Sequence, residues 1–342
     1  MKVFVTGGTG FVGSHVVKKL LDEGHDVRLF VRNKAKAEAL LNRLDIPVVD
    51  IVEGEISDRK TVSHALIDCN AVIHSAAATP LQNLSTAELL NTNVNGVKSV
   101  IGSACEQCLK HIVYVSSVTA VFQPGRSETT ADSPVVHTSH PYGKSKGLAE
   151  NYIRDLQAQG LPVKSVYPGG IVGPGDPGHS ATVMALWYRV TQGFKVTSGG
   201  TQQIDVRDLA SIIVALMAVE DGKPGRYMTV GHFMTWKKFA LLLESIIGRP
   251  LKKQVVPGWF LRMIGLGYDF KRLFVDVTSP ISAETMSYTT QWRPIENDPC
   301  IKAMKLRLRS PRETFHDTLE WMLQTGMLKP QDAPALSKSG TT

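Results

Sequence analysis

The sequence predicts an α/β protein with a doubly wound parallel sheet of the Rossmann type and a smaller α/β lobe formed mostly by its C-terminal part. In the first half of the chain, short β-branched runs alternate with helical patterns, which is typical of a parallel sheet covered by helices on both faces. A glycine-rich segment at residues 7–13 connects the first of these runs to the first helical pattern. The chain has 342 residues, more than one small core usually serves, so we expect the lobe to be attached to the sheet domain.

The expected strands are residues 2–5, 26–31, 47–52, 71–74, 111–116 and 162–167. Between the first two, Val12, Val16 and Leu20 recur at helical spacing, and Gly24 ends the helix. This segment is one complete unit of strand, helix and strand.

The pattern changes after Pro168, where a loop rich in glycine and proline covers residues 169–178. We expect residues 1–174 to form the sheet domain, with a return segment near residues 202–225. Residues 175–201 and 226–330 then form the lobe, and the polar tail at residues 331–342 is expected to be disordered. Open parallel sheets bind ligands beyond the carboxyl ends of their strands, so we expect the ligand site between the two parts.

Composition and charge argue against several classes of protein. Apolar residues make up 43% of the chain, as in ordinary globular proteins. The formal net charge is +7, but the late basic residues lack a nucleic-acid reader motif, so we interpret them as solvated surface without a nucleic-acid partner. A weaker alternative is that part of this charge steers an acidic ligand toward the site.

Targeting and cysteine patterns indicate a cytoplasmic protein. The first expected strand leaves no room for a leader segment, and the apolar residues 212–219 are fewer than the about 20 needed to span a bilayer. Four scattered cysteines do not make a disulfide framework. Cys105 and Cys108 lack a second pair or a histidine cluster, so we expect no metal site.

Gly7, Gly10 and Gly13 follow a strand and open a helix, which is the context of a dinucleotide-binding turn. The first glycine permits a tight turn, the second lets the backbone approach the pyrophosphate, and the third allows close packing of the helix on the sheet. The phosphates then lie at the positive end of the helix. The alternative is an ordinary strand-to-helix connection with incidental glycines. We therefore expect residues 1–174 to bind a dinucleotide.

The tip of the second expected strand favours NADP over NAD, although NAD stays open. An acidic residue about 20 positions after the glycines would bind the ribose hydroxyls of NAD, but this strand ends without a carboxylate. Arg32 stands there instead and can pair with a 2′-phosphate, with Lys34 or Lys36 as further candidates. Glu55 and Ile56, after Gly54, are placed where such folds hold the adenine edge.

Tyr142 and Lys146 are the candidate acid/base pair. They are four residues apart and share one face of a helix, so we expect the ammonium to lower the pKa of the phenol. A phenol needs such help to exchange protons at neutral pH. Ser116 and Ser117 end the fifth expected strand, and one of them can hold a substrate oxygen. Together with a dinucleotide, these residues indicate hydride transfer.

The chain resembles the extended short-chain dehydrogenase/reductase family, especially its dihydroflavonol reductase, cinnamoyl-CoA reductase and 3β-hydroxysteroid dehydrogenase branches. The resemblance covers most of the chain and rests on ordered motifs in about its first half: TGGTGFVG at 6–13, VIHSAA at 72–77, NVNG at 93–96, VSS at 115–117, PYGKSK at 141–146 and YPGGIVGPGD at 167–176.

This resemblance implies the roles of individual residues. Ser117 is then the serine that faces the substrate, Tyr142 the acid/base and Lys146 its electrostatic partner. The residues implied at the cofactor are Gly7, Thr9, Gly10, Phe11, Val12, Gly13, Arg32, Glu55, Ile56, Ala76, Ala77, Tyr142, Lys146, Pro168, Gly170 and Ile171. Asn93 is expected either to kink a helix or to act in a relay. A homodimer through the helices near residues 93–108 and 142–157 is also implied.

Two departures from the family bear on the reaction. Val118 and Thr119 replace the Asp-Glu pair of sugar-nucleotide dehydratases, which removes the acid and base for elimination. The loop 79–82 and the segments 259–261 and 263–264 are apolar rather than suited to a sugar diphosphate, although they could simply be core. We therefore expect an NADP-dependent oxidoreductase that interconverts a carbonyl and an alcohol on a fairly apolar small molecule. The alternatives are a sugar-nucleotide epimerase with tightly bound NAD and a non-catalytic NADP sensor.

Overall fold

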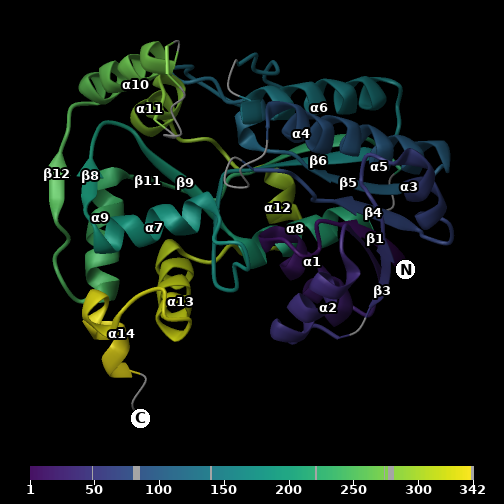
Figure 1. Cartoon of the computed structure of the whole chain (residues 1–342), viewed down its shortest axis with the longest axis horizontal. Helices are drawn as coiled ribbons and strands as arrows, with labels where there is room; N and C mark the ends of the chain where they lie inside the picture. The colour runs from purple at the N-terminus through teal and green to yellow at the C-terminus, as the bar shows by residue number, and fades with distance from the viewer. Residues whose placement is uncertain are drawn as a thin grey trace.

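The computed structural model describes residues 1–47, 49–79, 85–138, 141–219, 222–272, 274–275 and 281–339. Within them, a seven-stranded sheet forms the larger domain, in the order β10-β6-β5-β4-β1-β2-β3, and all of its neighbouring strands are parallel (Figure 1). Its strands are β1 (Lys2–Thr6), β2 (Asp26–Val31), β3 (Asp50–Glu53), β4 (Ala71–His74), β5 (His111–Val115), β6 (Val163–Pro168) and β10 (Gly225–Thr229). From β1 the chain first adds β2 and β3 on one side and then adds β4, β5 and β6 on the other side. This change of side leaves a crevice between the loops after β1 and β4.

Helices cover both faces of this sheet, and the predicted doubly wound α/β fold is confirmed. The helical segments of the domain are α1 (Phe11–Asp22), α2 (Lys34–Arg43), α3 (Arg59–Ala65), α4 (Thr86–Leu90), the π-helical η2 (Asn91–Asn95), α5 (Gly96–Glu106), the 3₁₀ turn η3 (Val118–Ala120), α6 (Pro141–Ala158) and α8 (Val206–Ala218). One buried cluster joins the sheet to α1, α2 and α8. A second joins the opposite face to α3, α5 and α6.

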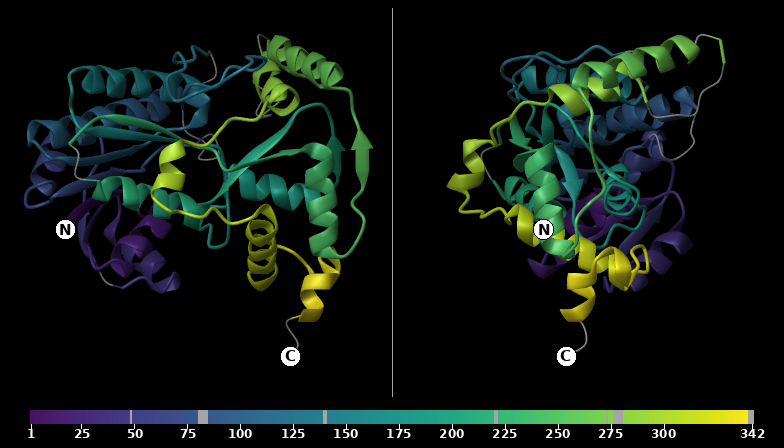
Figure 2. Two further views of the ribbon diagram at one scale, coloured as in Figure 1. Left: turned by 180° about the vertical axis from the view of Figure 1, so that it is seen from behind. Right: turned by 90° about the vertical axis from the view of Figure 1, so that its left-hand side faces the viewer.

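The smaller lobe lies beside the sheet domain and has its own core (Figure 2). Its strands form a three-stranded sheet, β11-β9-β7, and a two-stranded sheet, β12-β8. The strands of the lobe are β7 (Gly170–Val172), β8 (Phe194–Val196), β9 (Gly200–Asp205), β11 (His232–Thr235) and β12 (Lys253–Val255). The remaining described helical segments are α7 (Ala181–Thr191), α9 (Trp236–Ile247), α10 (Gly258–Arg272), α11 (Ala283–Gln291), α12 (Pro299–Ala303), α13 (Pro311–Gln324), η4 (Pro330–Asp332) and α14 (Pro334–Ser339).

Two expectations about the order of elements differ from the structure. The return near residues 202–225 brings back only α8, because β9 belongs to the lobe sheet. The strand that rejoins the large sheet is β10, which pairs in parallel with β6; apart from its first residue, Gly225, it lies in the stretch 226–330 that we assigned to the lobe. The third strand starts at Asp50 rather than at Pro47, a residue that has no backbone N–H to donate to a ladder.

The C-terminal segment is folded as far as the structure describes it. We expected residues 331–342 to be disordered, but Pro330–Asp332 forms a 3₁₀ turn and Pro334–Ser339 a short helix. Ala333 and Leu336 are buried in the lobe core. These two apolar side chains hold the segment against the lobe, together with Arg249, which donates to the backbone oxygen of Asp332 at 2.9 Å.

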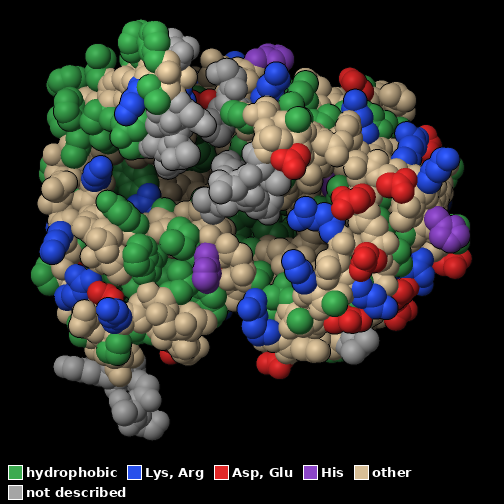
Figure 3. Space-filling model, in the orientation of Figure 1, with side chains coloured by type: hydrophobic (Ala, Val, Ile, Leu, Met, Phe, Trp, Pro, Cys, Tyr) green, Lys and Arg blue, Asp and Glu red, His purple; other side chains and the backbone are tan. Residues whose placement is uncertain are grey.

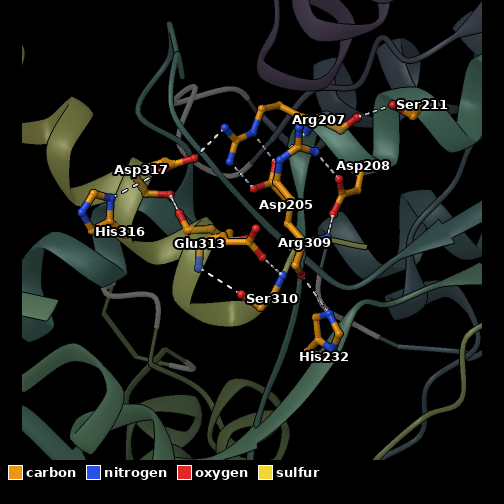
Figure 4. Close-up of polar contacts among 12 residues, drawn as sticks. Asp205, Arg207, Asp208, Ser211, His232, Arg309, Ser310, Glu313, His316 and Asp317 are labelled. Carbon is orange, nitrogen blue, oxygen red and sulfur yellow. Dashed lines mark hydrogen bonds and ion pairs between the residues drawn. The ribbon is translucent and has the colours of Figure 1, made fainter. Parts of the chain in front are cut away.

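A charged group that we call the interlobe cluster connects the two parts of the molecule (Figure 4). It consists of Asp205, Arg207 and Asp208 at the start of α8, with Arg309 and Asp317 from the C-terminal part of the chain. The Arg207 guanidinium donates to both carboxylate oxygens of Asp205, at 2.9 and 2.7 Å, and to Asp317 at 2.7 Å. Arg309 donates to Asp208 through its backbone N–H and its side chain. Since α8 packs on the large sheet and α13 packs in the lobe, these bonds fasten one part to the other.

In the described part of the chain, no helix combines the length and the apolar character needed to cross a membrane.

Candidate active site

The predicted site residues come from loops at one edge of the large sheet. The glycine turn follows β1, Ala76 follows β4, Ser117 follows β5 and Pro168 ends β6. These four strands are parallel neighbours, so their carboxyl ends meet at this edge. The face shown in Figure 3 is hollowed between the sheet domain and the lobe.

Backbone contacts explain two of the three glycines in the turn. Gly7 has a φ of +73°, and a Cβ added there would lie 2.6 Å from the backbone nitrogen of Ala76. A Cβ at Gly13 would lie 2.0 Å from the carbonyl oxygen of Gly7. A side chain at either position would therefore push the turn away from β4 or from α1.

The start of α1 can accept the phosphates of a dinucleotide. Gly10 is its N-cap and makes no side-chain capping bond. A Cβ at Gly10 would meet only the Gly7 oxygen, at 3.2 Å, so the backbone there is open to an approaching group. Thr9 and Val12 are partly exposed beside it. Phe11 differs, because its side chain packs against the lobe core.

The residues predicted to bind the adenosine part of the cofactor differ in how exposed they are. Arg32 is exposed directly after β2 and makes no hydrogen bond or ion pair within the described chain. Glu55 is exposed, whereas Ile56 is buried in a core cluster and contacts the position of Gly96. The sequence reasoning missed Glu53, an exposed carboxylate at the end of β3 that accepts a hydrogen bond from the Lys34 N–H at 2.6 Å. The signal that could have found Glu53 is the register of β2 and β3, because that register places Glu53 opposite Val31 at the end of β2.

Ser117 and Tyr142 are brought together. The Ser117 hydroxyl is a hydrogen-bond partner of the Tyr142 phenol and also accepts from the Thr119 hydroxyl at 2.9 Å. Burial raises the pKa of the phenol, and the bond to Ser117 opposes that change only in part. We expected the pKa of Tyr142 to be lowered by Lys146. In the structure, the loss of solvation dominates.

Lys146 is buried behind the tyrosine. Its Nζ lies 5.9 Å from the centre of the Tyr142 ring and 5.9 Å from the centre of the Tyr114 ring. Burial lowers the pKa of Lys146 to about 8, and the nearby negative charge of Glu150 acts in the opposite direction. The amine therefore stays mostly protonated at neutral pH and can stabilise a phenolate at Tyr142.

Ser116 has a different environment from its neighbour Ser117. Its hydroxyl donates to Glu150 at 2.8 Å, away from Tyr142. The buried Glu150 also accepts from the Tyr167 hydroxyl at 2.5 Å and from Arg154 Nε at 3.1 Å. The sequence reasoning missed this set, although Glu150 follows Lys146 by one helical turn.

Asn93 holds two parts of the site in place. Its side chain accepts from the Ala78 N–H at 2.7 Å and donates to the Ala78 oxygen at 3.0 Å and to the Ser145 hydroxyl at 2.9 Å. Ser145 in turn donates to the backbone oxygen of Tyr142 at 2.7 Å. The buried amide therefore ties the loop after β4 to the first turn of α6. It lies in the π-helical turn η2, next to a change in helix geometry.

Other predicted residues fall around this centre. Ala76 and Ala77 are partly exposed after β4, as are Gly170 and Ile171 in β7, whereas Pro168 is buried. His74 lies below them, fully buried, with its Nδ1 2.7 Å from the Thr6 hydroxyl, and burial lowers its pKa to about 3. Of the apolar loop 79–82, only Thr79 lies within the described residues.

Comparison with known proteins gives a consistent result. Residues 3–231 match the model of the NAD dependent epimerase/dehydratase family. The chain is 26% identical over 337 residues to sterol demethylase protein B of Methylococcus capsulatus, covering 96% of this chain and 100% of the relative. It is 29% identical over 267 residues to a dihydroflavonol 4-reductase of Hordeum vulgare, covering 71% and 74%. The solved UDP-glucose 4-epimerase of Bifidobacterium longum, in complex with NAD⁺ and UDP, shares the fold with a TM-score of 0.72 at 19% identity, over 95% of this chain and 99% of that one.

Proposed function

The chain belongs to the NAD-dependent epimerase/dehydratase family, and from this premise we propose that it is an NADP-dependent oxidoreductase that interconverts a carbonyl and an alcohol on a fairly apolar small molecule. Membership confirms the resemblance to the extended short-chain dehydrogenase/reductases and makes the protein an NAD(P)-dependent enzyme. The observation that carries the proposal is the contact of the Tyr142 phenol with the Ser117 hydroxyl, in front of the buried Lys146.

Tyr142, Ser117 and Lys146 can together carry out the proton transfer of the reaction. When bound, the nicotinamide cofactor gives or takes the hydride. In the reducing direction, Tyr142 donates its proton to the substrate oxygen, and Ser117 donates a hydrogen bond to the same oxygen. The Lys146 cation stabilises the phenolate that remains, because it lies close to the ring in a poorly solvated position.

An apolar substrate is supported by the surroundings of Ser117. Beyond the turn that follows it, the buried Phe122 stacks on Trp292 at a centroid distance of 4.2 Å and lies 5.4 Å from Tyr288, and Trp292 and Tyr288 are only partly buried. Val118 is buried and Thr119 bonds to Ser117, so no carboxylic acid stands where dehydratases have their acid pair. Relatives named for a sterol and for a dihydroflavonol agree with an apolar ring system.

A substrate screen tests the proposed reaction. We expect NADPH oxidation with at least one member of a panel of aldehydes, ketosteroids and acyl-CoA thioesters. Purified protein that carries stoichiometric, non-exchanging NAD and interconverts sugar nucleotides without net cofactor use would instead identify an epimerase. Firm NADPH binding without turnover on any substrate would identify a sensor.

The choice of cofactor is tested at Arg32. Replacement by alanine removes the exposed guanidinium after β2, so we expect the KM for NADPH to rise about 10- to 100-fold, as for loss of a charged hydrogen bond. The KM for NADH should change little. The matched control is Arg43→Ala, which removes the same charge at the far end of α2. Equal effects of Arg32→Ala on both cofactors would contradict a role in 2′-phosphate binding.

The pH profile tests Glu150 as a positioning residue that acts through Lys146. With a Lys146 pKa of about 8, kcat/KM for reduction should fall above that pH as the cation is lost. Glu150→Gln removes the charge that supports the cation, so the pKa of Lys146 drops and the falling limb moves to lower pH. Glu150→Asp keeps the negative charge, so the pH at which kcat/KM falls should stay nearer its original value. An unshifted limb in Glu150→Gln, with activity retained, would limit Glu150 to a structural role.

A further inference from the structure

The exposed face of α10 is apolar, which reverses the usual pattern of a helix at a protein surface. Trp259, Met263 and Phe270 expose 62%, 58% and 64% of their surface. Together with Leu266, they follow one another at intervals of three or four residues, so they form one stripe along the helix. We call these four residues, with Phe260 and Phe274, the α10 patch; all six are exposed, and hydrophobic side chains gather at this corner of the molecule in Figure 3.

Three polar residues of the same helix bond to neighbouring segments and hold it in this orientation. Arg262 donates to the Thr290 hydroxyl at 3.0 Å, and Asp269 accepts from Arg272 at 2.7 Å and from the Ala283 N–H at 2.8 Å. A Cβ at Gly265 would lie 2.5 Å from the backbone oxygen of Ser282, so α10 approaches the start of α11 closely. Turning the helix to bury the patch would break these contacts. The patch is therefore a fixed feature of the surface, and apolar patches of this kind mark interaction sites.

The charge near the patch favours an anionic partner. Between residues 252 and 276 the sequence carries five basic residues and two acidic residues, Asp269 and Asp276. Asp269 is paired with Arg272 and Lys253 with Glu244, whereas Lys252 and Lys271 are exposed and make no ion pair within the described residues. A second copy of the patch would bring like charges together. Large apolar and aromatic side chains with flanking lysines are instead the combination found in helices that lie in the interface of anionic bilayers.

We propose that the protein docks peripherally on anionic lipid bilayers through the α10 patch, with α10 lying in the plane of the membrane. The helix is already folded and held by α11, so binding needs no ordering of the segment. The basic residues draw the surface toward lipid head groups, and the apolar side chains enter the boundary with the acyl chains. This inference does not depend on the reaction proposed above, and its test uses no turnover.

Co-sedimentation with vesicles tests the docking. We expect the full chain to pellet with vesicles of phosphatidylcholine and phosphatidylglycerol, and at least about tenfold less with phosphatidylcholine alone or at high salt. The double variant Met263→Glu with Phe270→Glu should lower partitioning by about tenfold or more. The matched control is Tyr188→Glu with Leu241→Glu, which changes two exposed apolar side chains elsewhere in the lobe and should partition like the original chain. Circular dichroism establishes that both variants are folded.

A depth measurement gives a second readout that does not depend on the charged variants. All five tryptophans lie in the described part of the chain, and among them only Trp259 is exposed. Brominated lipids should therefore quench mainly Trp259, and Trp259→Phe should lose most of that quenching while it still binds vesicles. Failure of the original chain to bind either vesicle, or equal binding by the α10 double variant, would overturn the proposal. Loss of a dimer in that variant, seen by sedimentation velocity without lipid, would reassign the patch to self-association.

Discussion

Replacing Tyr142 by phenylalanine should lower the turnover number for carbonyl reduction by about 10³-fold or more, which is within the range of a lost general acid. The change removes one oxygen atom, the atom that contacts the Ser117 hydroxyl. Because the ring remains beside Lys146, the packing of α6 should persist. The measurement is single-substrate kinetics with NADPH at saturation.

The same experiment separates chemistry from cofactor binding. The glycine turn and Arg32 are untouched in Tyr142→Phe, so the dissociation constant for NADPH, measured by fluorescence titration, should change little. Tyr188→Phe is the matched control, since it removes a hydroxyl from an exposed tyrosine of the lobe and should leave turnover unchanged. Turnover at the original rate in Tyr142→Phe would refute the assignment of the acid/base residue.

Replacing Arg207 by methionine should reduce the free energy of unfolding by about 3–5 kcal/mol, because it leaves a buried carboxylate without its counter-charge. Asp205 is buried and accepts from two nitrogens of the Arg207 guanidinium. Urea unfolding followed by circular dichroism measures the change. Arg312→Met, at an exposed arginine of α13, is the control and should cost less than about 1 kcal/mol.

The loss of unfolding free energy in Arg207→Met should depend on pH in a predictable direction. Burial would raise the pKa of the Asp205 carboxyl, but the bonds with Arg207 outweigh it and hold the pKa below its usual value. The pair therefore stabilises the fold above the unfolded pKa of about 4, and this contribution disappears as the pH falls through the folded pKa. The difference in unfolding free energy between the original chain and Arg207→Met should therefore become smaller at acidic pH. If Arg207→Met unfolds at pH 7 with a free energy within about 1 kcal/mol of the original chain, the Asp205–Arg207 pair does not stabilise the fold as predicted.

Local patterns predicted much of the sheet domain. The bounds of β2 and β4 coincide with the expected segments 26–31 and 71–74, because buried parallel strands are short β-branched runs between clear breaks. The glycine turn was predictable for a similar reason. Its conformation depends on backbone contacts within a few residues and with the next strand, and only glycine meets them at Gly7 and Gly13.

The parts that the sequence did not predict depend on contacts between distant residues. Asp208 and Arg309 bond to each other although they are 101 positions apart, and nothing local marks either as a partner. The apolar segments 259–261 and 263–264 do not tell which of their side chains are covered, so Trp259 and Met263 could have been core residues. The pKa of Tyr142 likewise depends on how much surrounding structure removes water from the phenol, a quantity that the spacing of Tyr142 and Lys146 does not contain.

The position of Phe11 has a consequence for cooperativity. Its backbone belongs to the first turn of α1, while its ring packs with Trp187 and other residues of the lobe core. Val16, Val17 and Leu20 of the same helix pack in the core of the sheet domain. A single helix is thus shared between two hydrophobic interiors, so neither can melt without loosening the other. We therefore expect the sheet domain and the lobe to unfold in one cooperative transition, although each has its own core.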